Sequence, residues 1–217
     1  MSNLGDNLLR FNKDQKFLFF DTESCSLNLQ GNGNVPWEYA WSLSTQKVEL
    51  EFKEYLVQWP EIPIGKEAAL MTGFYGKQHR IATHGKSPEF VLEEFEKHLY
   101  DPSVIPVAHN GLGFDIFMHR IHRLRCGKQS DYSYLPRLID SNLLAKARKM
   151  DIKPDRENLL SWQYRLLNHR ARGIKTSLGT CCVDYGIEYK KEEAHAAAYD
   201  IIKMKDIFFK MIYEVEI

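Results

Sequence analysis

Four acidic residues and one histidine lie in three separated segments of this 217-residue chain: Asp21 and Glu23, then Asp115, then His195 and Asp200. Four oxygen-donor acids without a thiolate suit Mg²⁺ or Mn²⁺ rather than zinc. Such a site can hold two ions about 3.5–4 Å apart, which clamp the attacking and leaving oxygens of a phosphodiester. A bound ion lowers the pKa of water, and a nearby imidazole can take the proton. The residues predict hydrolysis of a phosphodiester by water, without a covalent enzyme intermediate.

Asp21 and Glu23 directly follow an unbroken apolar run at residues 17–20. Such a run suits a buried strand, and its short length argues against a helix. Residues i and i+2 of a strand point to the same face, so both carboxylates can converge on one ion. Two solvated acids at a strand end are an equally good interpretation of this motif alone. Its place after an apolar strand favours function, because open α/β sheets usually bind ligands there.

Asp115 follows a buried strand expected at residues 104–108 and a turn that contains Gly111 and Gly113. It would open the next helix. The simpler interpretation is that its charge favours the positive helix N-terminus, which is worth less than about 1 kcal/mol. Glycines in the turn also let the backbone and a substrate approach closely.

His195 and Asp200 are five residues apart, with three alanines among the residues between them. On a continuous helix, positions i and i+5 differ by about 140° and do not face one point. They converge if His195 lies in the preceding loop or first turn while Asp200 lies inside the helix. The alternative is a surface histidine at the start of an alanine-rich helix.

Together the three segments resemble the three motifs of the DEDDh group of 3′–5′ exonucleases, the DnaQ-like family. Asp21-Thr22-Glu23 matches the first motif, residues 109–115 match the second, and His195 with Asp200 matches the third. The similarity covers about residues 16 to 210. It implies that Asp21, Glu23, Asp115 and Asp200 bind two Mg²⁺ or Mn²⁺ ions and that His195 is the general base. It also implies a ribonuclease-H-like α/β fold, a five-stranded mixed sheet flanked by helices.

The chain departs from the family after the first motif. The family often has Thr-Thr-Gly-Leu there, whereas residues 24–27 read Ser-Cys-Ser-Leu, and the loop through Pro36 is long. By the resemblance, Leu27 would stack on or wedge the terminal base. Thr22, His109 and Asn110 are expected to contact the terminal nucleotide.

Apolar periodicity and turn residues give the expected elements. Strands are expected at 17–20, 38–43, 48–57, 104–108 and 135–139, the first three as an antiparallel meander. Helices are expected from Ser87-Pro88 to 99, from 114, from 141 to 149, over 178–185, and as one long helix from about 192. The charged segment 154–172 has a weaker helical pattern. We expect residues 1–217 to form a single exonuclease domain, with its core at about 16–210.

Other residues favour structural roles. The spacing of His119 and His122 would suit a metal, but neighbouring cations favour a solvated basic face. Trp37, Tyr39 and Trp41 alternate at strand period, which favours core packing over base stacking. Cys181 and Cys182 suit small buried hydrophobes. The basic segments 120–128, 146–149 and 169–175 could track a phosphate backbone or could be ordinary helix surface.

Lys plus Arg and Asp plus Glu both number 29, so the formal net charge is zero. This excludes a polybasic protein that binds polyanions through bulk charge, but not a local basic patch. We expect no membrane segment, because no stretch approaches the roughly 20 apolar residues needed to cross a bilayer. We also expect no secretory signal, because residues 1–16 have no apolar segment behind a basic start. The four cysteines show no CxxC or zinc-ribbon spacing. These features favour the reducing cytoplasm.

The predicted function is release of nucleoside monophosphates from a single-stranded or frayed 3′ end of DNA. An exoribonuclease is the alternative within the same family, and the 2′-OH would discriminate the two. A third alternative is a non-catalytic nucleic-acid-binding subunit of a polymerase complex. The resemblance to polymerase-associated proofreading members makes DNA the favoured partner and a DNA polymerase a possible second one. The oligomeric state is left open.

Overall fold

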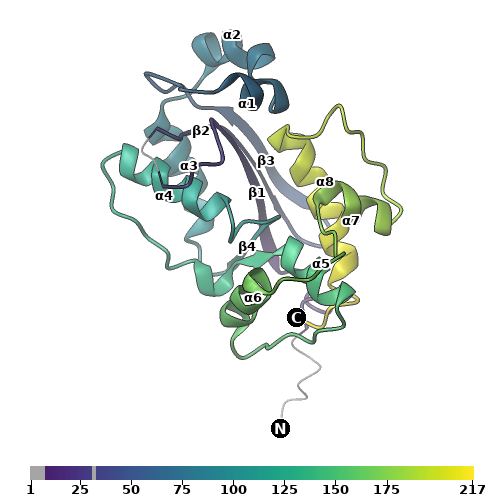
Figure 1. Cartoon of the computed structure of the whole chain (residues 1–217). Helices are drawn as coiled ribbons and strands as arrows, with labels where there is room; N and C mark the ends of the chain where they lie inside the picture. Colours follow the sequence, from purple (N-terminus) through teal and green to yellow (C-terminus); the bar gives the residue numbers. More distant parts are fainter. Residues whose placement is uncertain (1–7, 31–32) are drawn as a thin grey trace.

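Five strands form one mixed sheet in the order β3-β2-β1-β4-β5 (Figure 1). This computed structural model describes residues 8–30 and 33–217. The strands are β1 (Lys16–Ser24), β2 (Pro36–Ser44), β3 (Glu49–Leu56), β4 (Val104–Ala108) and β5 (Ile139–Asp140). β1, β2 and β3 pair antiparallel, whereas β4 pairs parallel to both β1 and β5. The predicted meander and the five-stranded mixed sheet are therefore confirmed.

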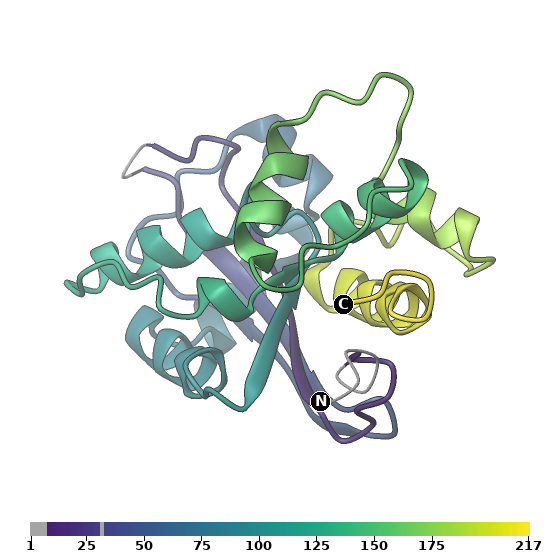
Figure 2. The ribbon, with the colours of Figure 1, turned by 90° about the horizontal axis from the view of Figure 1, so that it is seen from below.

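Helices cover both faces of the sheet (Figure 2). They are α1 (Lys66–Met71), α2 (Phe74–His84), α3 (Pro88–Leu99), α4 (Asp115–Arg125), α5 (Ser141–Lys149), α6 (Leu159–Asn168), α7 (Leu178–Asp184) and α8 (Ala197–Met211). α8 packs on β1, β2 and β3, whereas α3 and α4 pack on β1, β2 and β4. Within the described residues, no helix has the length and apolar character that a membrane crossing requires.

β1 sets the direction of the acidic side chains through its alternation. Phe17 and Phe19 both pack edge-on against Phe208 of α8, whereas Phe20 packs against Phe95 of α3. Because side chains alternate along a strand, the residues at odd positions face α8. The same alternation, continued to the end of the strand, turns Asp21 and Glu23 toward the helix that carries Asp200.

Three element predictions differ from the structure. α1 and α2 were not predicted, because the segment 58–86 mixes proline, glycine and charge without a strong helical period. The strand expected at 135–139 is a 3₁₀ turn over Leu135–Arg137 followed by the two-residue β5. The last helix begins at Ala197 instead of about 192, since residues 191–195 form turns.

The interpretation of His119 and His122 as a solvated basic face is wrong. Both are buried, with 2% and 0% of their surface exposed. His119 contacts Glu96 and Tyr134, and His122 lies between the Tyr39 hydroxyl and the Pro88 carbonyl. The apolar side of α4 carries both rings into the core, where hydrogen bonds satisfy their nitrogens.

The core predictions for aromatic and cysteine residues are confirmed. Trp37, Tyr39 and Trp41 are at most 1% exposed. Cys181 and Cys182 are buried free thiols of α7.

Candidate active site

Asp21 and Glu23 lie at the carboxyl end of β1, in the centre of the sheet. In the β1–β2 register, Asp21 lies opposite Ala40 and Glu23 lies opposite Glu38. The small Ala40 leaves space beside the Asp21 carboxylate, and a register shift after Glu23 ends the regular pairing. Both acids line a cleft of about 1600 Å³.

Asp115 is the first residue of α4 and is only 2% exposed. Its Oδ1 accepts a hydrogen bond of 2.8 Å from the hydroxyl of Thr22 on β1. Burial raises the pKa of Asp115 to about 7, although the Thr22 hydroxyl opposes this shift by stabilising the carboxylate. Thr22 therefore links the first acidic segment to the second.

The turn before Asp115 is held by Asp140, the residue that ends β5. The Asp140 carboxylate accepts hydrogen bonds from the backbone N–H groups of Asn110, at 2.9 Å, and of Leu112, at 3.1 Å. Asn110 has a φ of 68°, the left-handed region that asparagine tolerates better than most residues. A Cβ atom at position 113 would lie 2.6 Å from the amide oxygen of Asn110. Glycine is therefore needed there, because the Asn110 side chain packs directly against the backbone of residue 113.

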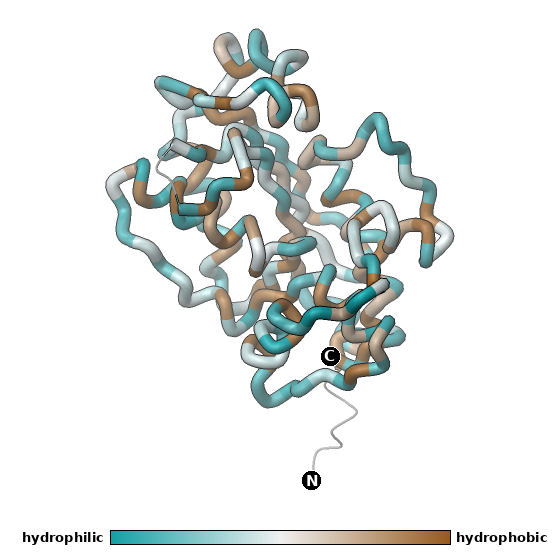
Figure 3. The backbone as a smooth tube through the Cα atoms, in the orientation of Figure 1, coloured by the Kyte–Doolittle hydropathy of each residue, from teal (hydrophilic) through white to brown (hydrophobic). Residues whose placement is uncertain are grey.

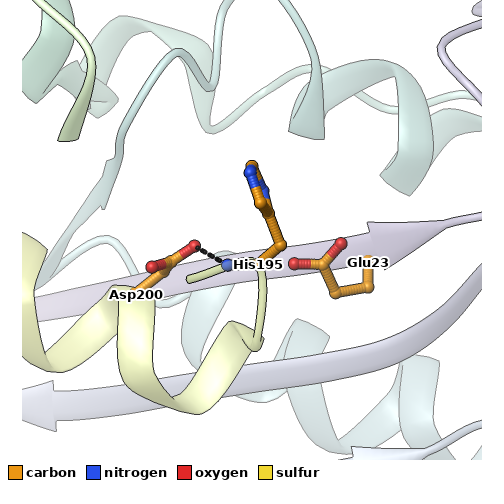
Figure 4. A group of neighbouring side chains, drawn as sticks. All are labelled: Glu23, His195 and Asp200. Atoms are coloured by element: carbon orange, nitrogen blue, oxygen red, sulfur yellow. Dashed lines mark hydrogen bonds between the residues drawn. The ribbon is translucent and has the colours of Figure 1, made fainter. Parts of the chain in front are cut away.

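The third segment has the geometry predicted for its two residues. His195 lies before α8 with a φ of 61°, and Asp200 lies in the first turn of that helix. The backbone N–H of His195 donates to Asp200 Oδ2 at 3.1 Å. Figure 4 shows Asp200 and Glu23 with His195 between them, and single ligand atoms of the three residues lie within 4.8 Å of one another. The loop that carries His195 is mostly hydrophilic (Figure 3).

The carboxylates repel one another and are poorly hydrated. Burial and the charges of Asp115, Glu23 and Asp200 raise the pKa of Asp21 well above its usual range. Burial, then the charge of Glu38, raise the pKa of Glu23 in the same direction. Burial raises the pKa of Asp200 to about 6. Such a cluster is costly without a counter-charge.

The residues fit divalent cations. Asp200 Oδ1 is buried and has no hydrogen-bond partner among the described residues, which is the situation of an oxygen that needs a cation. Carboxylate oxygens are the ligands that suit hard cations such as Mg²⁺ and Mn²⁺. Glu23 and Asp200 would share one ion with His195 beside them, and Asp21 and Asp115 line the same cleft.

The four predicted substrate contacts all line the cleft. Leu27 is 85% exposed and Asn110 is exposed, so both are accessible to a nucleotide. Thr22 is 5% exposed, and its hydroxyl is used by Asp115. Both ring nitrogens of His109 are occupied, by the Ser141 hydroxyl and by the Thr176 carbonyl, each at 2.9 Å. The role of each residue toward substrate stays a prediction.

Two parts of the site were missed from the sequence. The first residues of α1 and its exposed Met71 form one cleft wall, and Val183 of α7 lines the cleft from another segment. The Ile-Pro sequence at 62–63 and the glycine at 73 punctuate the α1 segment and could have signalled an ordered loop there. The second part is an ion pair between Glu38 and Lys77, which are 39 residues apart. No local pattern could have predicted it.

No family model and no curated protein matches the chain. Solved structures of E. coli exonuclease I are similar to it. The zinc-bound form in complex with single-stranded DNA has a TM-score of 0.68 and 16% identity, covering 92% of this chain and 40% of that chain. The complex with a dT13 oligonucleotide has a TM-score of 0.65 and 17% identity, covering 94% and 42%. A third structure, described as suggesting how processivity is achieved, has a TM-score of 0.64 and 18% identity, covering 92% and 43%.

At this identity the similarity establishes the fold. The chain has the ribonuclease-H-like architecture of these exonucleases, as the motif resemblance implied. It spans less than half the length of the exonuclease I chains.

Proposed function

We propose that this protein is a metal-dependent 3′–5′ exonuclease that hydrolyses single-stranded DNA to nucleoside monophosphates. The observation that carries the proposal is the convergence of Glu23, His195 and Asp200 within 4.8 Å, beside the buried carboxylates of Asp21 and Asp115. A purely structural role does not account for a cluster of carboxylates with raised pKa values in one cleft. The same cluster disfavours a non-catalytic nucleic-acid-binding subunit.

Asp21, Glu23, Asp115 and Asp200 would hold two Mg²⁺ or Mn²⁺ ions, and Asp200 Oδ1 is the oxygen most in need of one. Bound ions would supply the charge that lowers the pKa of water and stabilises the phosphate during displacement. His195 is exposed and acts as general base, taking the proton of the attacking water on an imidazole nitrogen. Thr22 fixes the Asp115 carboxylate, and Asp140 fixes the turn that presents Asn110.

The exposed Leu27 favours a single-stranded or frayed end. An apolar side chain that projects into a cleft can stack on or wedge an unpaired base, whereas a paired base hides its face in the duplex. The complexes of exonuclease I with oligonucleotides support DNA as the substrate. An exoribonuclease is the second candidate from the motif resemblance. Residues 1–217 would act as one exonuclease domain, and association with a DNA polymerase stays a prediction.

Digestion of end-labelled oligonucleotides tests the proposal. Matched DNA and RNA strands, single-stranded and duplex, are incubated with Mg²⁺, with Mn²⁺ or with EDTA. We expect stepwise shortening from the 3′ end of single-stranded DNA, with mononucleotides as the product, and no reaction in EDTA. Preferential digestion of RNA would replace DNA with RNA as the substrate. Cleavage in EDTA, or shortening from the 5′ end, would contradict the proposal.

A further inference from the structure

A long stretch of the chain beside the cleft contains no acidic residue. No Asp or Glu occurs from position 158 to 183, although the chain as a whole has 29. The basic residues of this stretch include Arg170, Arg172 and Lys175, in the loop that joins α6 to α7. Figure 2 shows this connection as a long loop that leaves the body of the protein and returns at α7. We call residues 169–175 the basic loop.

Two lysines of α5 hold the ends of the basic loop. Lys146 Nζ donates to the carbonyl oxygens of Leu166 at 2.6 Å and His169 at 2.5 Å. Lys149 Nζ donates to the Lys175 carbonyl at 2.6 Å and pairs with Asp184 at 2.5 Å. Charge-assisted hydrogen bonds of this kind are stronger than neutral ones. The loop is therefore anchored at both ends, and these two lysines are already occupied.

The three cationic side chains of the basic loop are free. Arg170, Arg172 and Lys175 are exposed, and within the described residues none of them makes an ion pair or a side-chain hydrogen bond. Arg165, the other basic residue of the acid-free stretch, is paired with Asp155 at 3.0 Å. Three unpaired cations on an anchored loop form an electrostatic patch that the neutral total charge conceals.

The basic loop leads directly into the cleft wall. The residue that follows the loop is Thr176. Its carbonyl oxygen accepts hydrogen bonds from the His109 ring at 2.9 Å and from the Asn142 side-chain amide at 3.0 Å. Ser177 then lines the cleft itself. Because a residue spans at most about 3.5 Å, Arg170 lies no more than about 20 Å along the chain from Thr176. This distance is within reach of a short single strand that leaves the cleft.

The charge of the cleft lining does not favour binding of a polyanion. Its charged lining comprises Asp21, Glu23, Lys66, Glu67, Asp115, Lys191 and Asp200, so acids outnumber lysines. Phosphates that extend beyond the bound cations therefore need a cationic surface outside the acidic centre.

We propose that the basic loop binds the phosphodiester backbone of the strand upstream of the nucleotides in the cleft. Arg170, Arg172 and Lys175 contact successive phosphates without reading bases. The inference rests on the proposed function, because it takes the 3′ end to lie at the acidic centre. Binding should therefore depend on the length of the strand. A substrate too short to extend out of the cleft does not contact the basic loop.

The test compares two charge-neutralised proteins with the wild type. One carries Arg170→Gln, Arg172→Gln and Lys175→Gln. The control carries Lys13→Gln, Lys16→Gln and Lys47→Gln, which remove the same charge near the start of β1, at the opposite end of the sheet from the acids. Substrates are single strands of about four and about twenty nucleotides. The short strand is expected to occupy the cleft alone, and the long strand is expected to reach the basic loop as well. The readouts are KM and kcat for nucleotide release, and the melting temperature.

We expect the loop variant to raise KM for the long strand by about 10-fold or more, with kcat and the short strand unaffected. The slope of log KM against log salt should fall by about 2, since each phosphate contact on a single strand contributes about 0.7. An unchanged KM for the long strand, an equal rise for both lengths, or the same effect in the control would overturn the inference. If the wild type releases no nucleotide, the proposed function fails, and anisotropy of the labelled long strand still tests the loop by itself.

Discussion

Two residues of the site hold a backbone conformation that residues with a side chain seldom adopt. Asn110 and His195 have φ values of 68° and 61°. This conformation costs roughly 1–2 kcal/mol for most residues and less for asparagine. Strained positions persist where the surrounding structure imposes them, often at functional sites. Here the Asp140 carboxylate fixes Asn110, and the Asp200 carboxylate accepts from the N–H of His195.

Replacing His195 tests its proposed role as general base. His195→Asn removes the imidazole but tolerates the left-handed backbone. We expect nucleotide release to slow by about 10²-fold or more, because a positioned base contributes 10²–10⁴-fold. Binding of Mg²⁺, measured by calorimetry, should persist through the carboxylates. An unchanged rate would remove His195 from the mechanism.

The hydroxyl of Thr22 lowers the pKa of Asp115, to which it donates a hydrogen bond. Thr22→Val keeps the shape of the side chain but removes the donor to Asp115 Oδ1, so the pKa of Asp115 should rise above about 7. We expect the acidic limb of the pH–rate profile to move to higher pH, so that the variant is slower than the wild type on that limb and recovers at high pH. Thr45→Val, in the turn between β2 and β3, serves as the control. A profile that does not move would show that Thr22 has no such role.

At the scale of elements, α2 is tied to the sheet beside a predicted metal ligand. Glu38 of β2 lies opposite Glu23, and its fully buried side chain places both oxygens 2.6 Å from Lys77 Nζ. Without Lys77, Glu38 would be an uncompensated charge in the interior. The pair therefore holds the α1–α2 segment, which supplies a cleft wall, at the end of the sheet that carries the site.

Lys77→Met should destabilise the protein by about 3–5 kcal/mol, the usual cost of removing one partner of a buried ion pair. Adding Glu38→Gln to it should recover much of this loss, because the unpaired charge is gone. Urea denaturation of the two single variants and the double variant measures the coupling. Simple additivity of the two single effects would show that the pair does not stabilise the structure.

The elements that the sequence predicted are those with local signals. The apolar run of β1, the Ser87-Pro88 start of α3 and the glycine turn before α4 each specify their own conformation. α1 and α2 lack such a signal and are held by long-range contacts such as Glu38–Lys77. The same limit applies to the candidate site. The motifs predicted the acids and His195 that line the cleft. Lys77 and the hydrogen bonds of Asp140 to the turn join residues far apart in the sequence, so no local pattern predicted them.

At the scale of the whole molecule, the neutral total charge conceals an acidic centre. The pKa of Asp115 is raised to about 7 and that of Asp200 to about 6, both by burial. Unfolded aspartates titrate near pH 4, as about 3.9 is their ordinary pKa. Between about pH 4 and pH 7 the folded, metal-free protein therefore holds protons that the unfolded chain has lost. Its stability falls as the pH rises through this range.

Thermal melts at several pH values test this linkage. In EDTA, the melting temperature should fall by several degrees from about pH 5 to about pH 7.5, since 1 kcal/mol corresponds to about 2–4 °C in a chain of this size. Saturating Mg²⁺ should raise the melting temperature at pH 7.5 much more than at pH 5, because cations compete with protons for the carboxylates. An Mg²⁺ effect of equal size at both pH values would contradict the acidic cluster as the binding site.

The decisive measurement for the proposed metal site is nucleotide release by the wild type and by Asp21→Asn, on 3′-labelled single-stranded DNA in Mg²⁺. Asparagine keeps the size of the side chain and removes one buried charge from the cluster. We expect a loss of at least about 10³-fold in rate, as for residues that act as a unit, with a melting temperature in EDTA equal to or above that of the wild type. Full activity of Asp21→Asn would show that this carboxylate does not hold a catalytic metal ion.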